Sequence, residues 1–146
     1  MNARTSGDVQ RPSNAFRTNI QVRFADTDAL GHLNNGSFVI YSETARLEFA
    51  RRLLGAGSRA LILAHLSVDF RRQVRYDEPV HVYTWIERIG RTSAALRQTV
   101  YAHEALAADV KSVIVSFDYT AQQPTGWTDD ARAAMLPYQH DRDMAS

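Results

Sequence analysis

The sequence contains no cysteine, and this absence removes several kinds of chemistry at once. Disulfide bonds, thiolate metal sites and a cysteine nucleophile are all excluded. The chain also lacks an apolar run as long as a membrane helix requires. Its first residues, Met1 to Pro12, are polar and lack the apolar region of a signal peptide. We therefore expect a cytoplasmic protein that does not insert into membranes.

An excess of charge of either sign is missing as well. Lys and Arg together number 17 against 16 Asp and Glu, which gives a formal net charge of +1 at pH 7. Binding to nucleic acid or to an anionic membrane surface usually requires a basic excess, so neither partner is expected. The histidines are dispersed without the spacing of metal ligands, and we expect no metal and no other cofactor.

The length and composition fit one globular domain. A chain of 146 residues with 45% hydrophobic residues can bury a substantial core. Residues 1–15 are rich in Ser, Asn, Arg and Gly, which predicts a flexible N-terminal segment. Residues 16–146 are expected to form a single domain, because no internal repeat or second domain is visible.

Extended segments with alternating apolar residues dominate this domain. The predicted strands are Thr18–Phe24, Leu61–Phe70, Pro79–Ile89, Thr92–His103 and Ala105–Tyr119. A long helix over Ser37–Leu54 carries apolar or small residues at three-to-four spacing, and a short one follows Thr128 as its N-cap. Consecutive strands joined by short turns pair antiparallel, and the long helix must bury its apolar stripe on the sheet. The pattern therefore predicts an α+β fold in which an antiparallel sheet curls around one helix.

A dense cluster of acid, imidazole and amide side chains lies between the first strand and the long helix. It reads Asp26-Thr-Asp-Ala-Leu-Gly-His-Leu and runs directly into Asn34-Asn35-Gly36. Catalytic groups are often held in this way, on a short loop between rigid elements and beside the positive end of a helix. This cluster is the part of the chain that points to chemistry.

The cluster belongs to a longer pattern. Val22–Asn35 is followed by Tyr41-Ser-Glu-Thr-Ala-Arg46, Val68-Asp-Phe-Arg71, Tyr76-Asp-Glu-Pro79 and Ile89-Gly-Arg-Thr-Ser93. This pattern resembles the hotdog-fold acyl-CoA thioesterases of the 4-hydroxybenzoyl-CoA thioesterase type. The resemblance implies a curved antiparallel sheet of five to six strands around one long helix. It also implies hydrolysis of an acyl-CoA thioester to free acid and CoA.

The resemblance assigns roles to individual residues. It implies that Asp28 is the general base or nucleophile and that a backbone N–H near Asn35 or Gly36 polarises the thioester carbonyl. The positive end of a helix gives a physical reason for that second role. The family places phosphate contacts near the turn that carries Arg91 and Ser93, which we therefore expect to bind substrate. A separate basic cluster at Arg71, Arg72 and Arg75 offers other guanidinium groups for phosphate.

Other residues of the cluster admit two interpretations. Asp26 either faces the site or bonds to nearby backbone N–H groups. His32 either polarises the carbonyl and orients water, as a catalytic residue, or is an ordinary polar residue before a helix. Asn34 is a natural N-cap, and Glu43 either supports the loop or pairs with Arg46.

Two functions besides thioester hydrolysis stay open from the sequence. One is a hydratase or dehydratase of the same fold, in which Asp28 and His32 act as an acid–base pair. The other is a non-catalytic module that binds an acyl group or CoA. Release of free CoA from acyl-CoA separates the first function from both alternatives.

The apolar segment Leu61–Val68 also bears on assembly. An exposed apolar strand edge is an aggregation hazard, and proteins usually cover such an edge. The resemblance implies that subunits pair strand edges into a continuous sheet, with active sites at the interface. We therefore expect a homodimer or homotetramer whose small-molecule partner is acyl-CoA.

Overall fold

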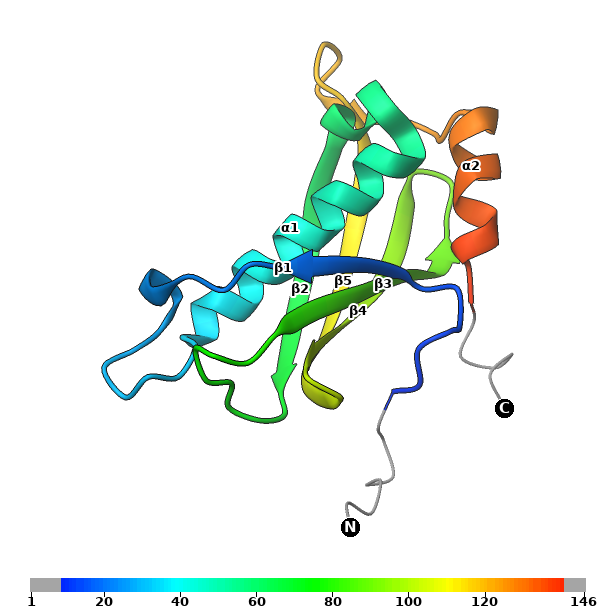
Figure 1. The fold of residues 1–146 in the computed structure, drawn as a ribbon. Helices are drawn as coiled ribbons and strands as arrows, with labels where there is room; N and C mark the ends of the chain where they lie inside the picture. Colours follow the sequence, from blue (N-terminus) through cyan, green and yellow to red (C-terminus); the bar gives the residue numbers. More distant parts are fainter. Residues whose placement is uncertain (1–8, 141–146) are drawn as a thin grey trace.

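The computed structural model describes residues 9–140, in which a strongly curved antiparallel sheet wraps one long helix (Figure 1). The strands are β1 (Phe16–Ile20), β2 (Leu61–Phe70), β3 (Val80–Ile89), β4 (Ser93–Ala102), β5 (Ala105–Asp118) and β6 (Gln123–Pro124). The helices are α1 (Asn35–Leu54) and α2 (Asp129–Met135), with short 3-10 turns at Phe24–Asp26, Gly55–Ala60 and Leu136–Tyr138. The predicted α+β architecture is therefore confirmed.

The sheet has the strand order β1-β3-β4-β5-β2, and each neighbouring pair is antiparallel. The predicted succession of hairpins holds for β3, β4 and β5, but it does not extend to β2. The linker of residues 71–79 crosses the end of the sheet instead, and the amides of Arg71 and Arg72 bond to the carbonyl of Ala107 at its start. Within the described chain, β1 and β2 are consequently the two edges of the main sheet.

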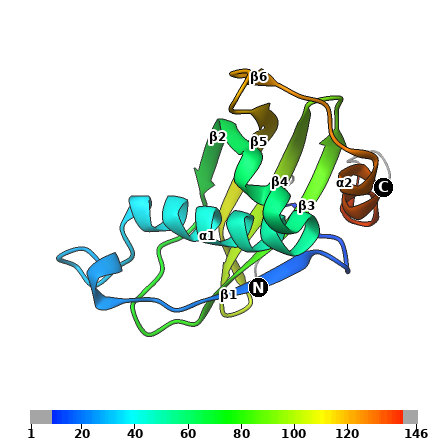
Figure 2. The ribbon, with the colours of Figure 1, turned by 90° about the horizontal axis from the view of Figure 1, so that it is seen from above.

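The core forms where α1 packs on the concave face of the sheet (Figure 2). On α1 the apolar stripe is buried at Phe38, Tyr41, Ala45 and Phe49. One face of β3 and one of β4 are buried as well, at Val80, Val82, Thr84, Ile86, Ala94, Leu96, Val100 and Ala102. Each large apolar side chain buried in this way contributes about 1.5–3 kcal/mol to folding.

The first strand differs from its predicted position. β1 ends at Ile20 rather than Phe24, and Phe24 instead opens a 3-10 turn and is 78% exposed. The alternation of apolar residues in the sequence did not reveal where β1 stops. On β5, Val110 and Ile114 face the core, whereas Val113 is half-buried on the opposite face.

The predicted short helix near the C-terminus is confirmed as α2. The Thr128 hydroxyl accepts a 3.1 Å hydrogen bond from the amide of Ala131, and Met135 is buried against the end of the core. Neither described helix is long and apolar enough to cross a membrane. Most of the predicted flexible segment, residues 1–8, lies outside the described residues.

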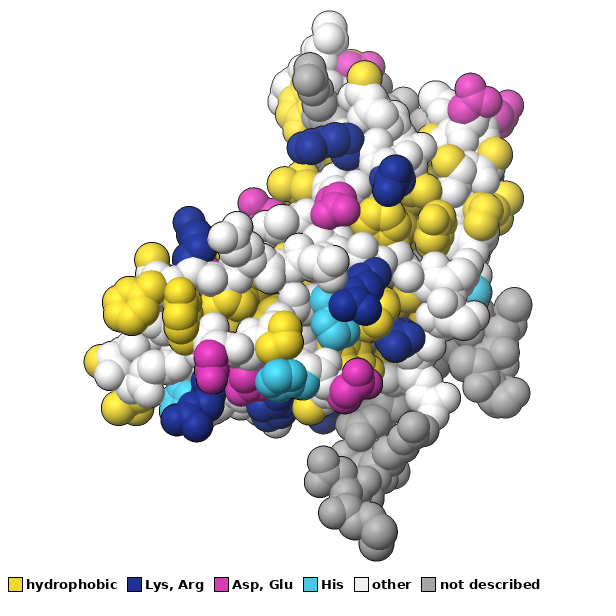
Figure 3. Space-filling view, in the orientation of Figure 1, with side chains coloured by type: hydrophobic (Ala, Val, Ile, Leu, Met, Phe, Trp, Pro, Cys, Tyr) yellow, Lys and Arg dark blue, Asp and Glu magenta, His cyan; other side chains and the backbone are white. Residues whose placement is uncertain are grey.

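The described surface carries charges of both signs. On the face that Figure 3 shows, basic and acidic side chains are interspersed with hydrophobic ones. This mixture agrees with the formal net charge of +1.

Candidate active site

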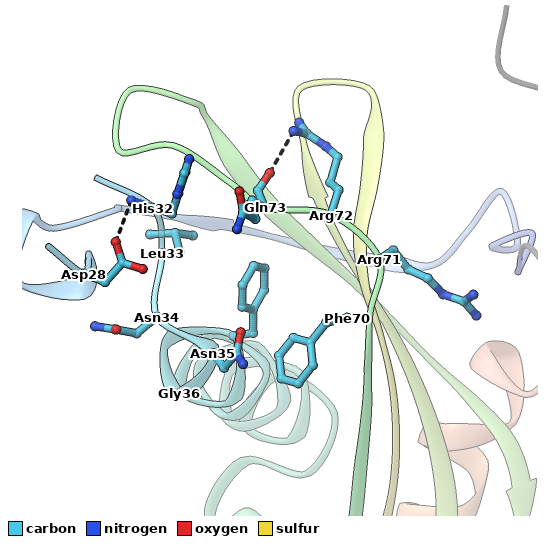
Figure 4. Close-up of a pocket in the computed structure, with 11 residues that line it drawn as sticks. Asp28, His32, Leu33, Asn34, Asn35, Gly36, Phe70, Arg71, Arg72 and Gln73 are labelled. Atoms are coloured by element: carbon cyan, nitrogen blue, oxygen red, sulfur yellow. Dashed lines mark hydrogen bonds between the residues drawn. The ribbon is translucent and has the colours of Figure 1, made fainter. Parts of the chain in front are cut away.

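A pocket of about 640 Å³ opens at the N-terminal end of α1 (Figure 4). Its walls come from the loop before α1, from the first turn of α1, and from the end of β2 with the linker that follows. The lining residues are Asp28, His32, Leu33, Asn34, Asn35, Gly36, Phe38, Phe70, Arg71, Arg72 and Gln73. The structure thus brings together four residues that the sequence analysis singled out for the site: Asp28, His32, Asn35 and Gly36.

Asp26 holds the start of this loop against α1. Its side chain is only 4% exposed, and Oδ2 accepts hydrogen bonds from the Tyr41 hydroxyl at 2.6 Å and from the Arg23 amide at 2.9 Å. Burial by itself raises the pKa of Asp26, but the hydrogen bonds from Tyr41 and Arg23 outweigh it, and the pKa lies below its ordinary value. The backbone carbonyl of Asp26 accepts bonds from the Asn34 amide and the Ser37 hydroxyl. These contacts agree with the interpretation in which Asp26 bonds to nearby backbone N–H groups instead of facing the site.

Asp28 lies in a tight turn that closes on itself. Its amide donates to the His32 carbonyl at 2.7 Å, and its carbonyl accepts from the Gly31 amide at 3.1 Å. Gly31 has φ +81, a conformation that glycine adopts at little cost. The side-chain Oδ1 of Asp28 accepts a 2.8 Å hydrogen bond from the amide of Leu30. It also accepts a 3.1 Å hydrogen bond from the amide of His32 (Figure 4).

These two amides also set the charge of the site. Hydrogen bonds from the backbone of Leu30 and His32 lower the pKa of Asp28 below its ordinary value. The side chain is exposed, so Asp28 is ionised at neutral pH. The turn uses Oδ1, while no hydrogen bond from the described residues engages Oδ2. One carboxylate oxygen is therefore free to act on a substrate or a water molecule.

The first turn of α1 supplies the second chemical group of the pocket. Asn34 occupies the N-cap position as predicted, although its side chain makes no capping hydrogen bond. The amides of Asn35 and Gly36 precede the intrahelical hydrogen-bond ladder, so no helical carbonyl accepts from them. A side chain added at Gly36 would meet nothing within 4 Å, so the space beside this backbone is open.

His32 lies on the pocket wall. Its backbone forms an antiparallel bridge with Arg75, which ties the Asp28 turn to the linker of residues 71–79. The ring atom Nδ1 is buried and has no hydrogen-bond partner among the described residues. No group of three or more metal-ligating side chains gathers around it or elsewhere in residues 9–140.

The arginines of the pocket are held by other groups. The Arg72 guanidinium bonds to Glu78 Oε2 at 2.6 Å and to the Ala102 carbonyl at 3.0 Å. Arg71 Nη2 lies 3.9 Å from Asp109 Oδ2. In Figure 4 both side chains extend away from Asp28. Within one chain, neither guanidinium is directed at the carboxylate.

Arg91 and Ser93 lie elsewhere in the subunit. They belong to the β3–β4 turn, which packs beside α2 (Figure 1), and they line no part of the pocket. Trp127 fixes this turn, because its amide bonds to the Arg91 carbonyl and its indole N–H bonds to the Ser93 carbonyl, both at 3.1 Å. A single chain therefore does not bring these two residues to Asp28.

Glu43 also lies outside the pocket lining. It is exposed on α1, whereas Arg46 is buried and reaches Gln98 Oε1 at 3.4 Å. Burial lowers the pKa of Arg46, and the nearby Glu43 carboxylate opposes that effect. The pairing of Glu43 with Arg46 is thus electrostatic and is not a short ion pair.

The apolar side of the pocket was not predicted from the sequence. Leu33, Phe38 and Phe70 form this side, and the rings of Phe38 and Phe70 meet edge to face with centroids 5.7 Å apart. Phe70 does stand in one of the quoted motifs, but nothing in that motif says that β2 ends beside the start of α1. The Leu33 amide bonds to the Val74 carbonyl at 2.8 Å, and this tertiary contact joins the loop before α1 to the linker of residues 71–79.

The chain is similar in sequence to known thioesterases. The chain matches the family model of the thioesterase-like superfamily over residues 22–135, a range that includes every pocket residue. It is 27% identical over 116 residues to the acyl-CoA thioester hydrolase YbgC of Escherichia coli, covering 75% of this chain and 87% of that protein.

Two solved structures share the fold at similar identity. A predicted thioesterase from Bacillus stearothermophilus superposes with a TM-score of 0.81 at 29% identity, covering 86% of this chain and 97% of that one. A thioesterase from Thermus thermophilus, solved with coenzyme A and Zn, gives a TM-score of 0.77 at 27% identity, covering 84% and 92%. On the family match and this agreement in fold, the chain belongs to the hotdog-fold thioesterase-like superfamily.

Proposed function

We propose that this protein hydrolyses an acyl-CoA thioester to the free acid and CoA, with Asp28 as the general base or nucleophile. The observation that supports the proposal most is one pocket that holds both an ionised carboxylate and the free amides of a helix start. Thioester hydrolysis requires these two groups: one that activates the attacking oxygen and one that stabilises the oxyanion. The superfamily of the chain supports the same reaction class.

The oxyanion is stabilised at the first turn of α1. The thioester carbonyl oxygen accepts a hydrogen bond from the amide of Asn35 or Gly36, next to the positive end of the helix dipole. The Asn35 carboxamide stands at the same turn and lines the pocket. Because negative charge grows on the carbonyl oxygen during attack, these donors bind the transition state more strongly than the substrate.

Asp28 activates the attacking oxygen. In the general-base route, Asp28 takes a proton from water as the water oxygen bonds to the carbonyl carbon. The tetrahedral intermediate then collapses, the C–S bond breaks, and the CoA thiolate receives the proton. In the nucleophilic route, Asp28 itself attacks the carbonyl carbon, the C–S bond breaks to release the CoA thiolate, and the resulting anhydride is hydrolysed by water. His32, which lines the pocket, orients the water or the carbonyl in either route.

CoA binding completes the proposal. The Thermus thermophilus relative was solved with coenzyme A. Arg91 and Ser93 line no part of the pocket of their own chain, so we assign the phosphate contacts to Arg91 and Ser93 of a neighbouring subunit. The unpaired edge of β2, where Leu63 is 43% exposed, is the surface through which such a homodimer or homotetramer would form.

A thiol assay on a panel of acyl-CoAs tests the function. The chain has no cysteine, so a thiol reagent reports released CoA without background from the protein. We expect catalytic thiol release from at least one acyl-CoA, with mass spectrometry detecting the free acid. Thiol release no faster than in buffer across the panel would overturn the proposal. Hydration of an enoyl-CoA with its thioester intact would instead indicate the hydratase alternative.

A further inference from the structure

The pocket has two chemically different sides. Asp28, His32 and Asn35 form a polar side, whereas Leu33, Phe38 and Phe70 form an apolar one. The thioester carbonyl must lie at the polar side to reach Asp28 and the helix amides. The acyl chain attached to it then lies against the apolar side, where it is removed from water.

Phe38 and Phe70 supply the two aromatic rings of this apolar side, and the two rings differ in how deeply they are buried. Phe38 is 2% exposed and packs into a core cluster in which Val74, Ala108 and Val110 are fully buried. Protein cores are close-packed, so truncation at Phe38 opens a hole in the core rather than a path. Phe70 is 48% exposed and stands at the end of the edge strand β2.

The same face of β2 continues the apolar surface beyond Phe70. Successive residues of a strand alternate between faces, so Phe70, Val68 and Leu66 point to one side. The β2–β5 register agrees, because these three residues lie opposite Ala108, Val110 and Ser112. Val68 and Leu66 pack against the core but are only partly buried, since α1 packs mainly on β1, β3 and β4. The Phe70 ring therefore stands between the pocket and an apolar strip along β2.

From these contacts we infer that Phe70 limits the length of the acyl chain, so that the native protein favours short acyl groups. The ring blocks the path along Val68 and Leu66, and its edge-to-face contact with Phe38 holds it in place. This inference rests on the proposed thioesterase function. It assigns the discrimination between short and long acyl-CoA substrates to a single residue.

Chain-length profiles of Phe70→Ala and the native protein test the inference. kcat/KM is measured on straight-chain acyl-CoAs from acetyl-CoA to palmitoyl-CoA. The native protein should be most active on a short member, and Phe70→Ala should move the optimum to longer chains. Each newly accommodated methylene should raise kcat/KM of the variant roughly fourfold relative to the native protein. A folded Phe70→Ala with the native profile would overturn the inference.

Three further variants make the test specific. Phe117→Ala is the matched control, because Phe117 is a half-buried phenylalanine of β5 that packs on Tyr119 and lines no part of the pocket. Its profile should match the native one, and an equal shift would overturn the inference. Adding Val68→Phe to Phe70→Ala should restore the short optimum by refilling the path. Phe70→Leu removes less volume and should give a smaller shift in the optimal chain length. This variant replaces Phe70→Ala in the test if the alanine variant does not fold.

The length limit and the proposed thioesterase function can fail independently of each other. If the native protein releases no CoA from any acyl-CoA, the thioesterase proposal fails. The length limit is then measured by calorimetric binding of the same acyl-CoAs to the native protein and to Phe70→Ala. Affinity that rises with chain length only in the variant supports the limit, and identical length dependence in both proteins rejects it.

Discussion

The phenolic hydroxyl of Tyr41 donates a 2.6 Å hydrogen bond to Oδ2 of Asp26, and this buried contact joins α1 to the loop that carries Asp28. Burial and the neighbouring Asp26 carboxylate raise the pKa of Tyr41 well above its ordinary value, so the hydroxyl keeps its proton and stays a donor. The two aspartates of the motif thus differ in their surroundings. Asp26 is buried and fixes the position of the loop, whereas Asp28 is exposed and lines the pocket.

Replacement of the buried carboxylate tests this division. Asp26→Asn removes the charge and leaves a single acceptor oxygen for the bonds from Tyr41 and Arg23. We expect a loss of about 1–3 kcal/mol in the free energy of unfolding at pH 7, measured by urea denaturation. Asp77→Asn, at an exposed aspartate, is the control and should change stability by less than about 0.5 kcal/mol.

The effect of Asp26→Asn should depend on pH. The pKa of Asp26 is lower in the folded chain than its ordinary value of 3.8, so its ionised form stabilises the fold above that value. This contribution is lost as the pH falls through the folded-state pKa. The stability difference between the native protein and Asp26→Asn should therefore shrink below pH 3.8. A difference that is constant from neutral to strongly acidic pH would contradict this role.

The sequence could predict those parts of the structure that depend on contacts between residues close together in the chain. Asp28, His32 and Asn35 lie within eight consecutive residues. A loop that joins a strand to the following helix therefore brings them together, whatever the rest of the fold. Thr128 caps α2 through a bond to an amide three residues later, which is also local. Phe70 joins the site only because β2 pairs with β5 and the following linker meets Leu33. No single segment carries that tertiary information.

The same distinction explains the misplaced end of the first strand. Ile20, Val22 and Phe24 alternate as a strand requires, and the sequence pattern extends β1 to Phe24. In the structure the carboxylate of Asp26 accepts a bond from the Arg23 amide and starts a 3-10 turn there. A buried partner on α1, Tyr41, fixes that carboxylate. A distant side chain therefore overrides the local alternation.

The edge of β2 predicts self-association. β2 has no strand on its outer side within the described chain, and Leu63 on it is 43% exposed. We expect a dimer or a tetramer at micromolar concentration, because pairing covers the unsatisfied backbone groups and the apolar side chains. Light scattering coupled to size exclusion gives the mass directly. A stable species near the chain mass of 16.4 kDa would contradict the prediction.

Arg91 tests the assignment of CoA phosphate contacts to a second subunit. Arg91 is exposed at the β3–β4 turn, and an exposed phosphate contact mainly assists binding. Arg91→Ala should raise KM for acyl-CoA several-fold, the effect of about 1 kcal/mol, and leave kcat nearly unchanged. Hydrolysis of a short acyl thioester without the nucleotide should be unaffected.

The control for that experiment is Arg51→Ala, which removes an exposed arginine from the last turn of α1. It should leave both substrates unaffected. Equal damage by Arg91→Ala to both substrates would show that Arg91 supports the fold or the site instead. No damage to either would remove Arg91 from the proposed CoA site.

Asp28→Asn tests most directly whether the Asp28 carboxylate is the general base or nucleophile of thioester hydrolysis. Asparagine keeps one side-chain oxygen to accept the amides of Leu30 and His32, so the turn should persist and the melting temperature should change little. It has no negative charge with which to take a proton or to attack. The measurement is kcat on the acyl-CoA that the native protein hydrolyses fastest. We predict a fall of about 10²-fold or more, whereas a folded variant that retains more than about half of the native kcat would contradict the account.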